Sequence, residues 1–73
     1  MSFKLIDKRN NSIEHVNLKT VLSFIRKSYK EYKVPMALEF LYDNKELHCG
    51  KFLITYRYDN NLTSELLATR LSD

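Results

Sequence analysis

The sequence predicts one α+β domain over residues 1–73, with a four-stranded, mainly antiparallel sheet, one long helix packed on one face and a short C-terminal helix. An apolar stripe at helical spacing occupies residues 18–33, and the pattern changes to the period of two that is typical of strands after Pro35. The composition, 44% hydrophobic and 29% charged, is ordinary for a globular domain. A chain of 73 residues has no room for a barrel enzyme or a dinucleotide-binding fold. The expected order of elements is ββαββα.

The first two strands form a hairpin. Residues 3–7 and 13–16 are the expected strands, and they flank a polar run at residues 8–12. This run contains Asn10 and Asn11, and asparagine tolerates the left-handed backbone of tight turns.

A long helix is expected over residues 18–33. Asn17 precedes it as a plausible N-cap. Pro35 restricts Val34 to an extended backbone, which would end the helix near Lys33. The apolar stripe consists of Leu18, Val21, Leu22, Ile25, Tyr29 and Tyr32.

After Pro35 the apolar pattern has period two, which predicts a strand over residues 36–42 and a turn at 43–46. Residues 47–58 follow as a longer strand, in which Gly50 would mark a bulge. The second-ranked alternative is a helix over residues 36–49 that Gly50 caps. After a loop at 59–61, Thr63 would cap the C-terminal helix, whose apolar side contains Leu62, Leu66, Leu67 and Leu71.

Residues with catalytic or metal-binding chemistry are sparse. With one glycine, the sequence has no phosphate-binding loop and no dinucleotide motif. His48 and Cys49 are adjacent, so in a strand they would point to opposite faces and could not act as a base and its nucleophile. Together with His15 they supply three zinc ligands without the paired short spacing of a structural zinc site. We therefore expect no enzymatic activity, no metal and no cofactor.

Cysteine content and hydropathy indicate the compartment. Cys49 has no partner in the chain for a disulfide, which fits a reducing environment. The sequence contains no apolar run of the length of a secretory signal or a transmembrane helix. The expected location is the cytoplasm, or the host cytoplasm if the protein is viral, and no membrane partner is expected.

The positive charge is concentrated on the expected helix. Residues 18–35 contain five basic residues and one acidic residue, whereas residues 59–73 contain one basic and three acidic residues. A basic surface of this kind binds a phosphate backbone or an acidic partner protein. The ordinary alternative is a solvated helix face whose lysines cover the edge of the core. The first candidate binding surface consists of Lys19, Arg26, Lys27, Lys30 and Lys33.

The second candidate surface is the sheet face opposite the long helix. One helix covers one face of a sheet, so the other would remain open to a partner or to a second copy of the chain. The expected residues of this open sheet face are Leu41, Lys51, Leu53, Thr55 and Arg57.

These observations favour a small non-enzymatic protein-binding module, a regulator or inhibitor of a partner protein. A viral or mobile-element origin is suggested only by the size and the Lys-, Asn- and Ile-rich composition. The alternative function is nucleic-acid binding through the basic helix face. A homodimer is a further possibility, and a self-assembling structural protein ranks third.

Overall fold

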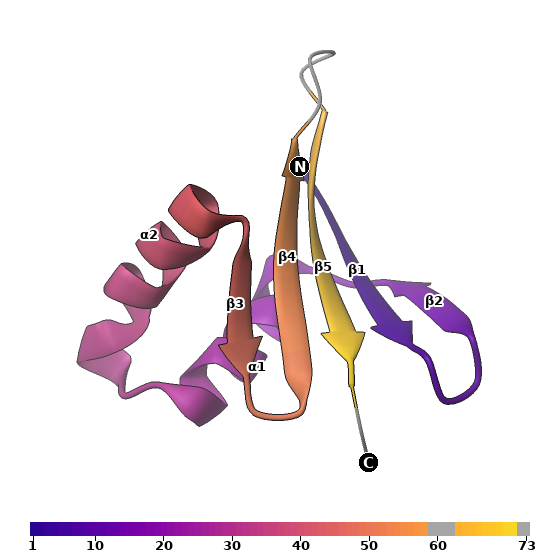
Figure 1. The fold of residues 1–73 in the computed structure, drawn as a ribbon, viewed down its shortest axis with the longest axis horizontal. Coiled ribbons are helices and arrows are strands. Elements are labelled where there is room, and N and C mark those ends of the chain that lie inside the picture. Colours follow the sequence, from indigo (N-terminus) through magenta and orange to yellow (C-terminus); the bar gives the residue numbers. More distant parts are fainter. Residues whose placement is uncertain (59–62, 72–73) are drawn as a thin grey trace.

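The computed structural model describes residues 1–58 and 63–71, and within them five strands form one mixed sheet (Figure 1). The small α+β class is confirmed, but the predicted four-stranded sheet with one long helix is wrong in detail. The elements are β1 (Ser2–Asp7), β2 (Ser12–His15), α1 (Leu18–Ser28), the 3-10 helix η1 (Glu31–Lys33), α2 (Val34–Asn44), β3 (Glu46–Cys49), β4 (Phe52–Tyr58) and β5 (Ser64–Arg70).

The strand order is β2-β1-β5-β4-β3, so the C-terminal strand lies at the centre of the sheet. β5 runs parallel to β1, with Leu5 opposite Ala68, and antiparallel to β4, with Ile54 opposite Ala68. The two hairpins, β1–β2 and β3–β4, are antiparallel and form the two outer parts of the sheet (Figure 1). The pairing of β1 with β5 therefore joins segments that are far apart in the sequence.

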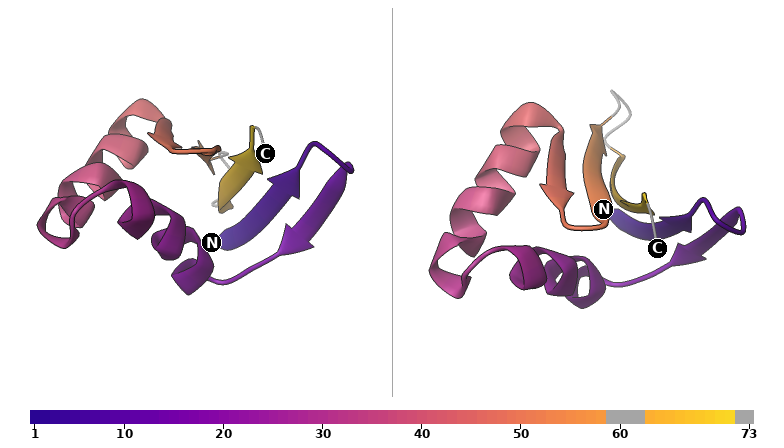
Figure 2. Two further views of the ribbon diagram at one scale, coloured as in Figure 1. Left: turned by 90° about the horizontal axis from the view of Figure 1, so that it is seen from below. Right: turned by 60° about the horizontal axis from the view of Figure 1, so that its bottom comes forward.

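Both helices lie on one side of the sheet, over the half that contains β3 and β4, and the β1–β2 hairpin extends away from them (Figure 2). The rings of Phe24 on α1 and Phe52 on β4 stack with their centroids 4.1 Å apart. Between the helices and the sheet lies the hydrophobic core: Val21, Ile25, Val34, Ala37, Leu41, Leu47, Cys49, Ile54, Leu66 and Ala68.

The predicted first hairpin is confirmed. Its turn is held by the Asp7 carboxylate, which accepts hydrogen bonds from the Arg9 main-chain nitrogen and guanidinium. These bonds hold the pKa of Asp7 at about 2, below its usual value. Asn11 has a φ of 57°, the left-handed conformation that asparagine tolerates.

The predicted helix over residues 18–33 is wrong after Ser28. Asn17 caps α1 as expected, because its side-chain oxygen accepts a hydrogen bond of 3.1 Å from the Thr20 nitrogen. The helix ends at Ser28, and the next residue, Tyr29, is extended. Pro35 lies in the first turn of α2, where a residue without an N–H is tolerated because that N–H would have no helical partner.

The predicted strand over residues 36–42 is also wrong, because this segment belongs to α2. Val34, Ala37 and Leu41 are its buried residues and follow helical spacing. The second-ranked alternative, a helix over 36–49, is the better interpretation as far as Asn44. Lys45 then ends the helix in the left-handed conformation, with a φ of 69°.

Residues 47–58 form two strands instead of one. Gly50 has a φ of 61° and, with Lys51, makes the two-residue turn between β3 and β4. A positive φ at the first turn residue is typical of a type II′ hairpin, so Gly50 marks a turn and not a bulge.

The C-terminal helix is absent from the described residues. Residues 64–70 form β5, and Leu66, Leu67 and Ala68 are buried in succession because this strand is central. Leu62 and the predicted loop at 59–61 lie outside the described residues. In the described part of the chain, no helix has the length and apolar character to span a membrane.

Candidate protein-binding surfaces

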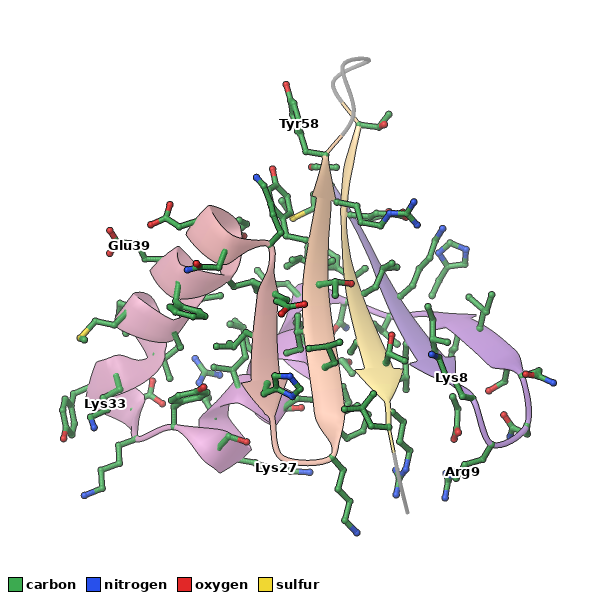
Figure 3. All side chains as sticks on the ribbon, viewed as in Figure 1. Lys8, Arg9, Lys27, Lys33, Glu39 and Tyr58 are labelled. Atoms are coloured by element: carbon green, nitrogen blue, oxygen red, sulfur yellow. The ribbon has the colours of Figure 1, made fainter. Side chains whose placement is uncertain are left out.

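The five basic residues of the first candidate surface do not line one helix. Lys19, Arg26 and Lys27 lie on α1, Lys30 follows it, and Lys33 ends η1. Figure 3 shows Lys27 and Lys33 at separate places, below and to the left of the sheet. The Arg26 guanidinium is 3.3 Å from the Glu31 carboxylate, which neutralises part of the charge. The expectation that all five lie on one helix is wrong, because the chain leaves the helix after Ser28.

The open sheet face exists and is turned away from both helices (Figure 2). On β4 it contains Leu53, Thr55 and Arg57, as predicted. Arg57 is exposed, whereas Leu53 and Thr55 are half-buried. Two predicted members are misplaced: Leu41 is fully buried in the core on α2, and Lys51 lies in the β3–β4 turn. Leu41 is misplaced because residues 36–42 are helical and never enter the sheet. Lys51 is misplaced because residues 47–58 form two strands joined by a turn.

The strand register adds charged residues to this open face. Arg57 lies opposite Glu65 on β5, and the Glu65 carboxylate is 3.9 Å from Arg57 and 3.2 Å from Lys4 on β1. Glu39 is not on this face and lies on the exposed side of α2 (Figure 3). On this face the half-buried side chains of Leu53 and Thr55 therefore lie beside the ion pairs of Glu65.

A third surface, on the solvent side of α2, was not predicted. Tyr32, Met36 and Phe40 are spaced four residues apart and have 71%, 67% and 53% of their surface exposed. We call these three residues the outer face of α2, although Tyr32 belongs to the preceding 3-10 helix η1. A helix of a small domain normally exposes polar residues on this side. α2 is thus apolar both toward the core and toward solvent.

A hollow of about 220 Å³ adjoins this outer face. Met36 and Phe40 form part of its wall, and its rim has a positive charge on Lys33. The Tyr29 hydroxyl is tied to the sheet by a hydrogen bond of 3.2 Å to the His48 main-chain oxygen. The hollow is lined by Tyr29, Lys33, Met36, Ala37, Phe40 and Leu47.

A second hollow, of about 250 Å³, lies at the end of β4 and β5. Its lining is mainly polar, and Tyr58 points away from the sheet beside it (Figure 3). It offers hydroxyl and charged groups but no apolar anchor position. The lining residues are Ser2, Arg57, Tyr58, Thr63, Ser64 and Glu65.

His48 and Cys49 point to opposite faces of β3, as predicted, with His48 exposed and Cys49 buried. Burial raises the pKa of the Cys49 thiol to about 11, so it is protonated at neutral pH. Among residues 1–58 and 63–71, no three His, Cys, Asp or Glu side chains come together as a metal site would require.

The outer face of α2 was missed because residues 36–42 were assigned to a strand. The spacing of four between Tyr32, Met36 and Phe40 was the available signal, and it continues the helical period past Pro35.

The chain matches no protein-family model, no curated protein and no solved structure at a significant level.

Proposed function

We propose that the chain is a non-enzymatic protein-binding module that binds its partner through the outer face of α2 and the hollow beside it. One observation carries the proposal: Tyr32, Met36 and Phe40, the outer face of α2, are exposed large apolar side chains. Clustered large apolar side chains on the surface of a domain are typical of interaction sites. Tyrosine, phenylalanine and methionine are also enriched at the centres of protein interfaces.

The lining of the hollow indicates the chemistry of the partner. Met36, Ala37, Phe40 and Leu47 offer apolar walls to one side chain of a partner, and Lys33 stands at the rim. A carboxylate on the partner would pair with the opposite charge of Lys33. The overall charge of +3 also favours an acidic partner. The proposed partner segment has an apolar anchor with an acidic residue close to it.

The basic residues support the alternative of nucleic-acid binding less well. A phosphate-tracking surface needs several free cations in line. Here Lys27 and Lys33 lie apart, and Arg26 is paired with Glu31. We propose protein binding first, with the role of a regulator or inhibitor that acts by occupying the surface of its partner.

The test compares Phe40→Ser with Tyr58→Ser, which removes an aromatic ring of similar exposure from the far end of β4. A partner recovered in stoichiometric amount from native cells would be purified and titrated against each variant by calorimetry. We expect Phe40→Ser to weaken the complex by ~10-fold or more and Tyr58→Ser to leave it unchanged, because interface hot spots exceed about 1.4 kcal/mol. Equal affinities for the two variants would refute the assignment to α2.

Nucleic acid is tested in parallel. If the chain binds duplex DNA with a salt slope of about −0.9 per neutralised phosphate, the alternative function replaces the proposed one.

A further inference from the structure

The two edges of the sheet differ in how they are covered. At the β3 edge, the Tyr29 hydroxyl donates to the outward-facing carbonyl of His48, and α2 lies beside the strand (Figure 1). At the other edge, all four residues of β2 are exposed, and no described helix lies beside them (Figure 2). An uncovered edge strand presents unpaired main-chain groups that can pair with another strand.

The register of β2 shows which groups are unpaired. The Val16 nitrogen donates to the Phe3 oxygen at 3.0 Å, so that pair faces inward. In an antiparallel ladder the pairs alternate, which turns the main-chain groups of Ile13 and His15 outward. Outside the strand ladder, no hydrogen bond of Ile13 or His15 is found among the described residues.

The side chain of Ile13 adds an apolar contact to this edge. It is 67% exposed and lies opposite Ile6 on β1. The same row crosses the sheet through Thr69 on β5 to Leu53 on β4. A strand added outside β2 would continue this row.

We propose that the β2 edge pairs with the β2 edge of a second copy, in an antiparallel two-fold arrangement centred on Ile13. This register places the two Ile13 side chains opposite each other and Glu14 opposite Ser12 of the second copy. Apolar pairs directly across two strands are stabilising, and no like charges face each other.

The neighbouring symmetric registers are less favourable. Centring the contact on Glu14 would place two carboxylates opposite each other, which destabilises a strand pair. Centring it on His15 would place two polar imidazoles opposite each other, without the apolar contact of two isoleucines. Of these three registers, the Ile13 register gives an apolar pair at the centre with no like charges opposite each other. A contact of one short strand is smaller than the about 800 Å² per partner of a stable complex, so we expect a weak dimer with a Kd of about 10 µM to 1 mM.

Sedimentation equilibrium tests the dimer, with Ile13→Asp as the disrupting variant. Two aspartates opposite each other should raise the dissociation constant ~10-fold or more. Circular dichroism checks that the variant is folded, and Ile13→Thr, a smaller side chain that keeps strand propensity, serves as the matched control. A wild-type chain that remains monomeric at 1 mM, or a dimer that Ile13→Asp leaves unchanged, overturns the proposal. So does a dimer that is lost in Phe40→Ser and kept in Ile13→Asp, because the contact would then lie on α2.

Cysteine cross-linking tests the register. Ile13→Cys should give the disulfide-linked dimer in highest yield under mild oxidation, and Glu14→Cys and His15→Cys clearly less. The native Cys49 is buried and does not interfere. A maximum at residue 14 or 15 overturns the Ile13 register. These tests need no partner protein, so their outcome is independent of the function proposed for α2.

Discussion

The Tyr29 side chain hydroxyl donates a hydrogen bond of 3.2 Å to the main-chain oxygen of His48, and this bond joins the end of α1 to the edge strand β3. Tyr29 is the residue at which the chain leaves the helix, with an extended backbone. The same side chain lines the hollow beside the outer face of α2. One residue therefore ends the helix, covers a sheet edge and shapes the proposed binding site.

Removing the Tyr29 hydroxyl should lower the stability of the fold by a small but measurable amount. We expect Tyr29→Phe to lower the free energy of unfolding by about 0.5–1.5 kcal/mol, the usual contribution of one hydrogen bond, with the low end favoured because water reaches the site. Tyr32→Phe is the matched control, since Tyr32 is 71% exposed and has no described hydrogen bond. Urea unfolding measures both variants. Equal stabilities would show that the Tyr29–His48 bond contributes nothing.

Adjacent residues on α2 should respond very differently to truncation. Leu41 is fully buried, so Leu41→Ala should destabilise the fold by about 2–5 kcal/mol through lost burial and a cavity. Phe40 is 53% exposed, and Phe40→Ala should change stability by less than about 0.5 kcal/mol. Thermal or urea unfolding of the two variants gives the comparison. A larger loss for Phe40→Ala would mean that the outer face of α2 is covered within the domain.

The same segment shows what the sequence could and could not predict. The period-two pattern of Met36, Leu38, Phe40 and Tyr42 is real, but it arises because α2 is apolar on both sides. Met36 and Phe40 lie on the outer face, whereas Leu38 packs against the core and Tyr42 against the Tyr56 ring. Two interleaved pairs, each with a spacing of four residues, together give the alternation of a strand. Pro35 strengthened the error, since a proline in a first helical turn and a proline after a helix end give the same local signal.

The first hairpin and the N-cap of α1 were predictable because local chemistry determines both. The strand β5 was not predictable, because its burial pattern depends on its position in the sheet. Leu66, Leu67 and Ala68 are buried in a row between β1 and β4, so the segment lacks the alternation of a half-buried strand. For the open sheet face, the positions of Leu53, Thr55 and Arg57 were predictable because β4 alternates locally. The position of Leu41 was not, because it depended on a strand that does not form.

The β3–β4 turn gives a test of backbone strain. Gly50 has a φ of 61°, and a Cβ added there would meet only the Ser28 side-chain oxygen, at 3.6 Å. Space is therefore available, and the cost of Gly50→Ala is conformational, about 1 kcal/mol. Gly50→Asn should cost less, because asparagine is accepted at the positive φ of hairpin turns more readily than alanine. Lys51→Ala, at the next and exposed turn residue, is the control. We expect the free energy of unfolding to decrease from wild type to Gly50→Asn to Gly50→Ala. A Gly50→Ala variant as stable as wild type would contradict the turn geometry.

Cys49 should be unreactive in the folded chain. It is 3% exposed, and burial raises its pKa to about 11, so little thiolate is present at neutral pH. A thiol reagent should label it slowly in buffer and rapidly in denaturant. Labelling in buffer as fast as that of a free thiol would show that β3 opens readily.

The raised pKa of Cys49 also predicts a pH dependence of stability. The folded state holds the thiol proton more tightly than the unfolded state, whose cysteine has the ordinary pKa of about 9. The resulting stabilisation is complete below about pH 9 and is lost as the pH rises through about 11. Cys49→Ala should remove this component, so the stability difference between wild type and variant should shrink over that interval. Because lysines and tyrosines titrate in the same range in both proteins, the comparison isolates the thiol, and a difference that stays constant with pH would mean that Cys49 ionises normally.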